Sequence, residues 1–450
     1  MSESSENQSG APEPIGVVGV GWVGLVTAAC FAEQGHEVWA MDVDADKIGS
    51  LSAGEVGIHE PGLPELVRGN AERLNFTTSM GDLLDHVRLL FCCVDTPPTY
   101  SGDADLSRVQ AVVGQLSGDS EHALVMKSTV PAGTGESIRR DLPSLTYVSC
   151  PEFLKEGSAV ADFLHPDRVV IGADRGDEWA ADAVADAYRP LGGELVRTDV
   201  ASAEMIKLAS NAFLATKISF INEIANVCEE VGADVTEVAR GMGLDERIGP
   251  QFLNAGIGYG GSCFPKDVTA LKQLAGNSGY HFQLLNSVIE VNELQKRRVL
   301  GKLARHLGPL AGKRVALLGL AFKPHTDDMR EASSLVLAAR LQGEGAQVVA
   351  FDPVARENGS GLLPSVEMAG SAEEALRGAD AAVLVTEWPE FAALDWRAMA
   401  AEMASPVVVD GRNFLDPEAM REAGIIYEGI GRGTARPLSR QPGSLADETA

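Results

Sequence analysis

A short apolar run that leads into three spaced glycines constrains the fold of this chain most. Residues 15–20 (IGVVGV) carry Gly19, and Gly21 and Gly24 follow at the start of the helical pattern VGLVTAACFAEQ. In such a strand-loop-helix unit the first glycine allows a tight turn, the second lets a ligand approach the backbone, and the third lets helix and strand pack closely. The helix N-terminus then offers free N–H groups to an anion such as a pyrophosphate.

An acidic residue closes the next expected strand. The segment HEVWAMD ends at Asp42, 18 residues after Gly24. A carboxylate at this place accepts hydrogen bonds from a ribose diol and repels a 2′-phosphate, so the pattern favours NAD over NADP. The alternative is an ordinary strand-to-helix turn in which Asp42 only caps the next helix. The order of strand, loop, helix, strand and acid favours the dinucleotide.

The rest of the chain predicts two α/β regions with a helical segment between them. Residues 14–200 and 313–430 both alternate continuous apolar strands with helical patterns, which is typical of parallel sheets covered on both faces. Residues 201–231 contain neither Pro nor Gly and predict one long helix, and residues 282–306 predict another. We expect an α/β protein with two doubly wound, Rossmann-like domains joined by a long-helix central segment. The expected parts are a disordered tail (1–13), a first domain (14–200), the central segment (201–308), a second domain (309–432) and a disordered tail (433–450).

The charge balance narrows the class of partner. The 37 Lys and Arg against 64 Asp and Glu give a net charge of −27, which disfavours nucleic acid and anionic membranes as partners.

No apolar run approaches the roughly 18 residues of a membrane span, and the N-terminus lacks the pattern of a signal peptide. Six cysteines in 450 residues predict reduced thiols in a cytoplasmic protein. We predict no metal site.

One cysteine differs in its surroundings from the other five. Cys263 follows the glycine-rich segment GIGYGGS and precedes Lys266 and Asp267, whereas the other cysteines lie in apolar settings. If Phe264 begins a helix, its dipole and nearby cations favour a thiolate at Cys263. The alternative is an ordinary thiol in a flexible loop. Beside a nucleotide fold, the pattern indicates covalent catalysis coupled to hydride transfer.

Several polar residues are candidates to serve that thiol. Lys207 and Asn211 stand four apart on one face of the long helix, where a lysine is equally compatible with a solvated surface and with a site. Glu152, with Glu156, follows an expected strand end, where a carboxylate can bind ligands or simply begin a helix. Thr129 also follows a strand and can hold water or cap a turn.

The motifs together resemble the UDP-glucose/GDP-mannose 6-dehydrogenase family over about residues 15–431. The resemblance is carried by GVGWVG, EPGL, CVDTP, KSTVP, PEFLKEG, HPDRVVIG, AEMIKLASNAFLATKISFINEIA, GYGGSCFPKD and LGLAFKPHTDD. It implies oxidation of the C6 alcohol of a sugar nucleotide to a carboxylate with two NAD⁺, through a thiohemiacetal and a thioester on Cys263. UDP-glucose is the expected substrate, and GDP-mannose or another UDP-hexose is the alternative. The segment differs from the family's usual CVGTP by Asp95, at a place that the resemblance puts near the nicotinamide pocket.

The resemblance also implies a role for individual residues. Lys207, Asn211 and Asp267 surround the C6 oxygen and a catalytic water, Thr129 helps to hold that water, and Glu152 assists thioester hydrolysis. The implied cofactor residues are Gly19, Gly21, Val23, Gly24, Asp42, Lys47, Thr96, Thr129, Glu156, Lys266 and Arg330. The implied substrate residues are Glu152, Phe153, Leu154, Lys155, Glu156, Lys207, Asn211, Arg247, Phe252, Leu253, Asn254, Gly256, Gly260, Phe322, Lys323 and Arg412. Arg247 resembles a residue that reaches a neighbouring subunit's substrate, so a homodimer is implied.

Two other classes of protein share parts of this pattern. A two-electron dehydrogenase of the hydroxyacid kind has the same two-domain layout but needs no thiol, which Cys263 argues against. A catalytically silent nucleotide-binding protein is disfavoured because Cys263, Lys207, Asp267 and Glu152 are all present.

Overall fold

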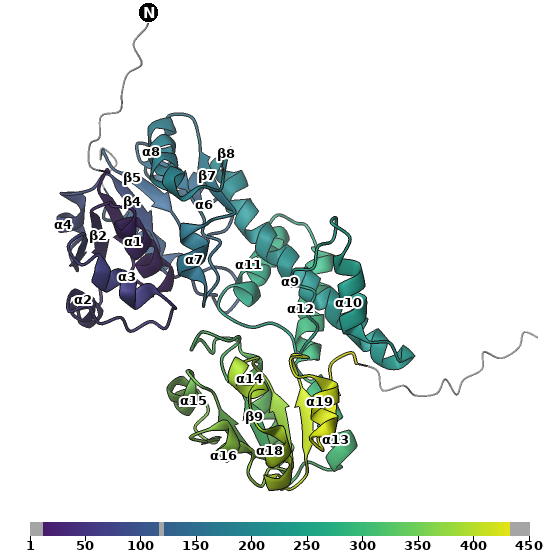
Figure 1. Ribbon diagram of the computed structural model, residues 1–450. Coiled ribbons are helices and arrows are strands. Elements are labelled where there is room, and N and C mark those ends of the chain that lie inside the picture. The colour runs from purple at the N-terminus through teal and green to yellow at the C-terminus, as the bar shows by residue number, and fades with distance from the viewer. Residues whose placement is uncertain (1–11, 117–120, 433–450) are drawn as a thin grey trace, which may run out of the picture. The chain divides into compact units, whose positions relative to one another are not determined.

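The computed structural model describes residues 12–116 and 121–432 (Figure 1). The expected disordered tails, 1–13 and 433–450, lie outside these residues except for Pro12 and Glu13. Internal contacts divide the chain into two compact units. The N-terminal unit comprises Met1–Ala212 and Lys266–Phe282, and the C-terminal unit comprises Phe213–Pro265 and Gln283–Ala450. The three-part boundaries expected from the sequence stay a prediction.

The N-terminal unit is built on an eight-stranded sheet with the order β3-β2-β1-β4-β5-β6-β7-β8. All neighbouring strands are parallel except β6 and β7, which are antiparallel. The strand order reverses between β1 and β4, and this is where such sheets bind ligands, at the carboxyl ends of the strands. The strands are β1 (Ile15–Val18), β2 (Val38–Met41), β3 (Leu74–Thr77), β4 (Leu89–Cys92), β5 (Ala123–Met126), β6 (Thr146–Ser149), β7 (Arg168–Ala173) and β8 (Glu194–Thr198).

Helices cover both faces of this sheet, as the buried strands require (Figure 1). One apolar core joins the sheet to α1, α3, α7 and α8, and a second core joins the opposite face to α4, α5 and α6. The helices are α1 (Trp22–Glu33), α2 (Ala45–Ser52), α3 (Leu63–Gly69), α4 (Met80–Leu84), α5 (Ser107–Val113), α6 (Thr134–Asp141), α7 (Ala159–Leu164), α8 (Glu178–Tyr188) and the 3₁₀ turn η1 (Arg189–Leu191).

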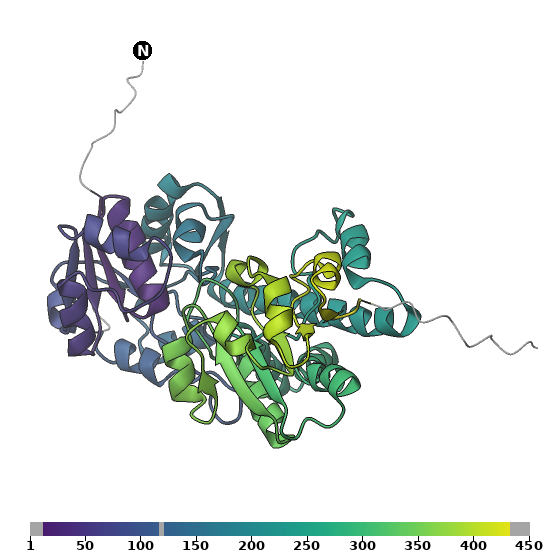
Figure 2. The ribbon, with the colours of Figure 1, turned by 60° about the horizontal axis from the view of Figure 1, so that its bottom comes forward.

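The C-terminal unit contains a six-stranded sheet, ordered β11-β10-β9-β12-β13-β14, whose strands are all parallel. Its green and yellow strands come forward in Figure 2. The strands are β9 (Arg314–Leu318), β10 (Gln347–Phe351), β11 (Glu367–Met368), β12 (Ala381–Leu384), β13 (Val407–Asp410) and β14 (Ile426–Gly429). The helices that follow and interleave with them are α14 (Ser333–Gly343), α15 (Arg356–Leu362), α16 (Ala372–Leu376), α17 (Pro389–Ala392), α18 (Trp396–Glu402) and α19 (Pro417–Glu422). The predicted fold class, with two doubly wound α/β sheets, is confirmed.

The long helix expected at 201–231 is α9 (Val200–Val231), and this prediction is also confirmed. It is followed by α10 (Val235–Gly243) and, after the glycine-rich loop, by α11 (Phe264–Asn277). No helix in the described part of the chain is long and apolar enough to cross a membrane.

The second long helix, expected at 282–306, is wrong. The structure has two helices there, α12 (Gln283–Gln295) and α13 (Arg298–Leu307). At the break the Arg297 N–H bonds to the Leu294 carbonyl 3.1 Å away, three residues back instead of four. The apolar pattern alone does not reveal this break, because the turn between the helices continues to bury side chains such as Lys296.

Candidate functional site

The glycine loop after β1 has the geometry that its sequence predicts. Gly19 has φ +89°, a value that favours glycine, and a Cβ at Gly24 would stand 1.8 Å from the Gly19 carbonyl oxygen. At Gly21 the nearest atom to an added Cβ is the Asp95 Oδ1, 4.0 Å away. Gly19 and Gly24 are therefore needed for the turn and for packing, while Gly21 leaves the space that a pyrophosphate would use.

Asp42 lies directly after β2, beside this loop. Its Oδ2 accepts the Val20 N–H at 3.0 Å and a hydrogen bond from Lys47 Nζ at 3.1 Å, and its Oδ1 accepts the Asp44 N–H at 3.1 Å. Burial raises the pKa of Asp42, but these hydrogen bonds outweigh burial and hold the pKa below its ordinary value. The carboxylate is thus ionised next to the glycine loop, where it can accept hydrogen bonds from a ribose.

The C-terminal unit repeats this layout, but there the carboxylate of the acidic residue is bonded by the protein itself. Asp352, directly after β10, is buried. It accepts hydrogen bonds from the N–H groups of Leu320, Ala321, Val354 and Ala355 and from Trp388 Nε1, at 2.7–3.1 Å. A carboxylate that is satisfied by five protein donors has no room for a ribose. The residues therefore fit a dinucleotide in the N-terminal unit and not at the equivalent place in the C-terminal unit.

Glu152 and Lys207 form a buried ion pair in the N-terminal unit. Lys207 Nζ lies 2.9 Å from Glu152 Oε1, and the two side chains are 4% and 6% exposed. The Leu154 N–H donates to Glu152 Oε2 at 2.6 Å. Burial raises the pKa of Glu152, but attraction to Lys207 and these hydrogen bonds outweigh burial and lower the pKa below its ordinary value. The surface alternative for Lys207 is therefore wrong, because the residue is buried.

A second buried pair lies one turn further along α9. Asn211 Nδ2 donates to Asp267 Oδ2 at 2.6 Å, and Lys266 Nζ lies 2.7 Å from Asp267 Oδ1. Both Asn211 and Asp267 are buried. With Glu204, which is also buried, Lys207 and Asn211 form a polar stripe on α9 at the spacing of one helix face. The structure thus brings Lys207 and Glu152 together, and likewise Asn211, Lys266 and Asp267.

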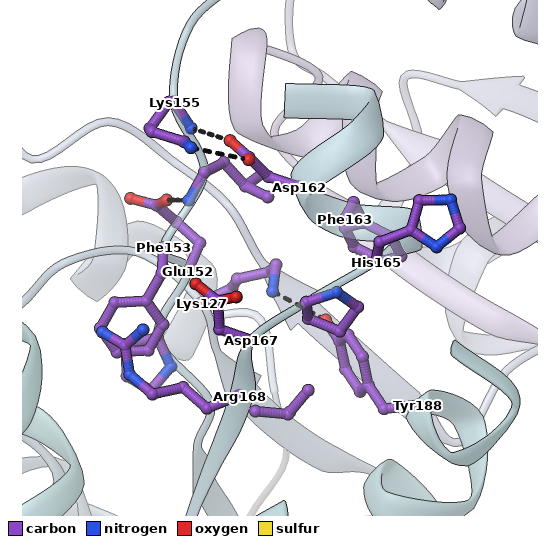
Figure 3. A pocket seen from close by; sticks show the side chains of 14 residues that line it. Lys127, Glu152, Phe153, Lys155, Asp162, Phe163, His165, Asp167, Arg168 and Tyr188 are labelled. Atoms are coloured by element: carbon purple, nitrogen blue, oxygen red, sulfur yellow. Dashed lines mark hydrogen bonds and ion pairs between the residues drawn. The ribbon is translucent and has the colours of Figure 1, made fainter. Parts of the chain in front are cut away.

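A polar cavity of about 160 Å³ opens beside Glu152 (Figure 3). Lys127 points across it to Tyr188, with its Nζ 2.7 Å from the phenol oxygen, and Arg168 stacks 3.9 Å from the Phe153 ring centre. A cavity with this polar lining can hold water within reach of the Glu152 carboxylate. The sequence analysis did not identify Lys127 and Tyr188. The sequence signal for Lys127 was a lysine at the end of an expected strand, which by itself is common.

Thr96 and Thr129 lie at the carboxyl ends of neighbouring strands. Thr96 follows β4 and Thr129 follows β5, and Thr96 Oγ1 donates to the Thr129 carbonyl at 2.8 Å. This bond ties together two loops at the edge of the sheet that also carries the glycine loop.

Cys263 lies in the C-terminal unit, directly before the first residue of α11. The predicted helix start at Phe264 is confirmed. Cys263 is partly exposed, whereas the other five cysteines are buried. Burial raises the pKa of those five thiols, to about 12 for Cys30 and about 11 for Cys92. Of the six, all within the described residues, Cys263 has the surroundings of a reactive thiol.

The glycines before Cys263 are required by the protein itself. A Cβ at Gly260 would lie 2.2 Å from the Glu331 carbonyl oxygen, and one at Gly256 would lie 2.7 Å from the Gly411 carbonyl oxygen. At Gly256 and Gly260 protein backbone thus occupies the space that a side chain would need.

Three buried amide side chains that the sequence analysis missed hold this loop. Asn222 Oδ1 accepts the Gly256 N–H at 2.8 Å, and Gln295 Nε2 donates to the Gly256 carbonyl at 2.9 Å. Asn292 makes two bonds to the Tyr259 backbone, at 2.8 and 3.1 Å. Their only sequence signal was a polar residue on the apolar face of a helix.

The remaining predicted substrate residues of the C-terminal unit differ in exposure. Arg412 donates to the carbonyls of Val385, Gly258 and Phe322, so its guanidinium joins the glycine-rich loop to the second sheet. The Arg247 side chain is 88% exposed and pairs with Asp245. The others are placed as follows: Phe252 has φ 63°, Leu253 is buried, Asn254 is exposed, and Lys323 Nζ lies 5.4 Å from the Phe322 ring centre. Arg330, a predicted cofactor residue of the same unit, pairs with Asp328.

Comparisons with known proteins bear on these residues directly. The UDP-glucose/GDP-mannose dehydrogenase family matches with three models, its NAD binding domain over residues 13–192, its central domain over 201–294 and its UDP binding domain over 316–417. The chain belongs to this family. The family's NAD binding domain covers the glycine loop and Asp42, and NAD is the cofactor.

Relatives and solved structures agree with this assignment. A UDP-glucose 6-dehydrogenase of Bacillus subtilis is 46% identical over 94% of this chain and 98% of its own length, and one of Haloferax volcanii is 44% identical over 92% and 99%. The structure of a UDP-glucose dehydrogenase from Pyrobaculum islandicum has a TM-score of 0.86 at 38% identity and covers 95% of this chain and 100% of that one. The expected family is therefore confirmed.

Proposed function

We propose that this protein is an NAD-dependent UDP-glucose 6-dehydrogenase that converts the C6 alcohol of UDP-glucose to the carboxylate of UDP-glucuronate. The named activity of its full-length relatives supports the sugar nucleotide. The observation that carries the chemistry is the buried, ionised Lys207–Glu152 pair beside a polar cavity. A carboxylate that is ionised and has water within reach can act as a base for that water.

The chemical steps require a nucleophile that holds the aldehyde between two oxidations. In the proposed sequence the C6 alcohol first gives up its hydroxyl proton and a hydride and becomes the aldehyde. The Cys263 thiolate then adds to the aldehyde carbon, the C–S bond forms, and the electron pair of the C=O π bond moves to the C6 oxygen. Loss of a hydride from that carbon then leaves a thioester. When bound, NAD⁺ accepts a hydride, so two molecules in turn take up the four electrons. Covalent capture keeps the carbon in place and prevents escape of the aldehyde.

The buried polar groups act on the oxygen atoms and on water. Lys207 and Asn211 donate hydrogen bonds to the C6 oxygen as negative charge develops on it. Glu152 accepts a proton from the water that attacks the thioester, the C–S bond breaks, and Cys263 leaves as a thiolate. Asp267 orients Asn211 through the 2.6 Å bond, and Thr129 helps to hold the water.

The other predicted residues are proposed to bind the two ligands. Phe153, Leu154, Lys155 and Glu156 follow Glu152 in the same segment, and Arg168 stacked on Phe153 stiffens that segment. The remaining proposed substrate residues are Arg247, Phe252, Leu253, Asn254, Gly256, Gly260, Phe322, Lys323 and Arg412. The proposed cofactor residues are Gly19, Gly21, Val23, Gly24, Asp42, Lys47, Thr96, Thr129, Glu156, Lys266 and Arg330.

A panel of sugar nucleotides tests the substrate. We expect UDP-glucose to give a kcat/KM at least about tenfold above that of GDP-mannose and of UDP-N-acetylhexosamines, measured by NADH absorbance. Cys263→Ala serves as the control, because it removes the nucleophile but leaves both binding sites. If the kcat/KM is higher with GDP-mannose than with UDP-glucose, GDP-mannose replaces UDP-glucose as the assigned substrate. Turnover of a 2-hydroxy acid that is unaffected by Cys263→Ala would favour the two-electron class instead.

We also propose that the protein works as a homodimer in the cytoplasm. On α9 the side chains of Phe213, Phe220 and Val227 are 65%, 50% and 56% exposed, and their seven-residue spacing puts them on one face of the helix. A second copy would cover this apolar face. Light scattering of the native chain should give twice the chain mass, and Phe220→Glu should shift it toward the monomer.

The cytoplasmic location is supported by the lack of disulfides among the six cysteines, all of which lie within the described residues.

A further inference from the structure

The place where the strand order reverses in the N-terminal unit carries an unexpected carboxylate. Strands β1 and β4 lie side by side, and the segment after β4 continues along β1, since the Cys93 N–H donates to the Val18 carbonyl at 2.8 Å. Val94 Cγ1 lies 3.0 Å from where a Cβ on Gly19 would stand. Asp95, the next residue, has its Oδ1 4.0 Å from the corresponding point on Gly21. The Asp95 side chain therefore borders the space above the second glycine of the loop.

A carboxylate at this position has an electrostatic cost for the cofactor. Gly21 is the point at which the backbone approaches a pyrophosphate, and two anions a few ångströms apart repel each other. The Asp42 carboxylate also lies beside the glycine loop, where it accepts the Val20 N–H, and the Lys47 ammonium is already bonded to Asp42. An unpaired Asp95 would thus weaken the binding of NAD⁺.

Arg108 supplies the opposite charge. Its Nη1 lies 3.0 Å from Asp95 Oδ2, and the two side chains are 59% and 69% exposed. Arg108 is the second residue of α5, where the helix dipole disfavours a cation. The Asp95 bond and attraction to Asp105 offset that unfavourable position. The guanidinium is therefore held at the border of the glycine loop by groups outside its own helix turn.

We propose that Arg108 is a cofactor-binding residue that contacts the pyrophosphate of NAD⁺, and that Asp95 positions it there. A guanidinium presents five N–H donors in a planar fork, and the bond to Asp95 engages only one of its edges. The remaining donors match the geometry of a phosphate. The carboxylate that holds Arg108 borders the space above Gly21, since Asp95 Oδ1 lies 4.0 Å from where a Cβ on Gly21 would stand. Together Asp95 and Arg108 are neutral, so the pair removes the repulsion that Asp95 alone would cause.

Equilibrium binding of NAD⁺ to the full chain, measured by titration calorimetry, tests this role. We expect Arg108→Ala to raise the Kd about tenfold, because it removes a phosphate contact and leaves the Asp95 charge uncompensated. Asp95→Gly combined with Arg108→Ala should recover part of that loss, to within about threefold of the native chain. The KM for the sugar nucleotide should stay unchanged in both variants.

Arg140→Ala is the matched control. The Arg140–Glu136 ion pair is similarly exposed, at 71% and 81%, but Arg140 lies in the last turn of α6. If Arg108→Ala unfolds at a lower temperature than the native chain, Arg108→Gln replaces it, since it keeps a polar side chain without the charge. An Arg108 variant that binds NAD⁺ within twofold of Arg140→Ala would overturn the proposal. An equal loss in the single and double variants would overturn the repulsion between Asp95 and the cofactor, and with it the reason given for pairing Asp95 with Arg108.

Discussion

Lys207 is the residue on which the charge state of the proposed site depends most. It is a buried cation that forms an ion pair with a buried carboxylate, Glu152. Burial alone would raise the pKa of Glu152, and the lowered pKa of the native protein depends first on Lys207. Removing one member of such a pair leaves a buried charge uncompensated, which costs about 3–5 kcal/mol.

Lys207→Met should therefore reverse the pH dependence that Glu152 gives to stability. In the native chain the pKa of Glu152 is lowered, so its contribution is present above pH 4.5 and is lost as the pH falls through the folded pKa. In Lys207→Met burial dominates and the pKa is raised, so the variant gains stability relative to the native chain as the pH falls. Denaturant unfolding of both chains at pH 7 and pH 5 tests this, because the native contribution of Glu152 is constant over that range and only the variant should change. A destabilisation of Lys207→Met that is equal at the two pH values would contradict this account.

Cys263 should be the thiol that reacts first with an alkylating reagent. Burial raises the pKa of the other five thiols, so they stay protonated and shielded at pH 7.5. Brief treatment with iodoacetamide should add one label, located on Cys263 by peptide mass spectrometry, and Cys263→Ser should take up none. Equal labelling of Cys93 or Cys150 would show that the thiols are not distinguished by burial.

At the scale of elements, the glycine loop separates packing from ligand approach. A methyl group at Gly24 would stand 1.8 Å from the Gly19 carbonyl oxygen, but one at Gly21 meets no atom closer than 4.0 Å. Gly21 also has an ordinary φ of −70°, so alanine fits its backbone. The two glycines thus have different tasks within one turn.

Alanine at these two positions should give opposite patterns. Gly24→Ala should destabilise the protein by about 3 kcal/mol, because α1 must move away from the turn. Gly21→Ala should change the melting temperature little and should weaken NAD⁺ binding, because its methyl group occupies the approach of the pyrophosphate. Melting temperature and NAD⁺ affinity of each variant are the measurements. If Gly21→Ala melts at a lower temperature than the native chain and binds NAD⁺ with native affinity, Gly21 is needed for packing and not for the approach of the ligand.

Local sequence patterns predicted most elements but not their interruptions. The uninterrupted α9 followed from the absence of Pro and Gly in 201–231. The break between α12 and α13 did not, since no Pro or Gly marks it and Lys296 is buried at the turn. The sequence also could not predict which polar side chains of these helices are buried, because burial depends on the partner that faces each side chain. The buried ones are Lys207, Asn222, Asn292 and Gln295. A polar residue on an apolar helix face has the same local pattern whether it is buried or solvated.

At the scale of the whole molecule, the two α/β units share a layout but not a ligand. Asp42 keeps its carboxylate at the glycine loop, while Asp352 is satisfied by five donors of its own unit. The repeat of the strand and helix pattern was visible in the sequence. That hydrogen bonds from the protein itself occupy the Asp352 carboxylate was not visible, because Trp388 and the Leu320 turn reach it only in the folded chain. The assignment of NAD to the N-terminal unit is consistent with this difference.

In the proposed reaction the protein oxidises one alcohol twice and holds the aldehyde on Cys263 between the two oxidations. This reaction is tested most directly by counting NADH formed per UDP-glucose consumed, with an aldehyde-trapping reagent present. We expect two NADH per sugar nucleotide and no trapped aldehyde. With Glu152→Gln we expect a covalent sugar-nucleotide acyl adduct on Cys263 in the intact mass. One NADH per UDP-glucose with free aldehyde, or two NADH with Cys263→Ala at a near-native rate, would contradict it.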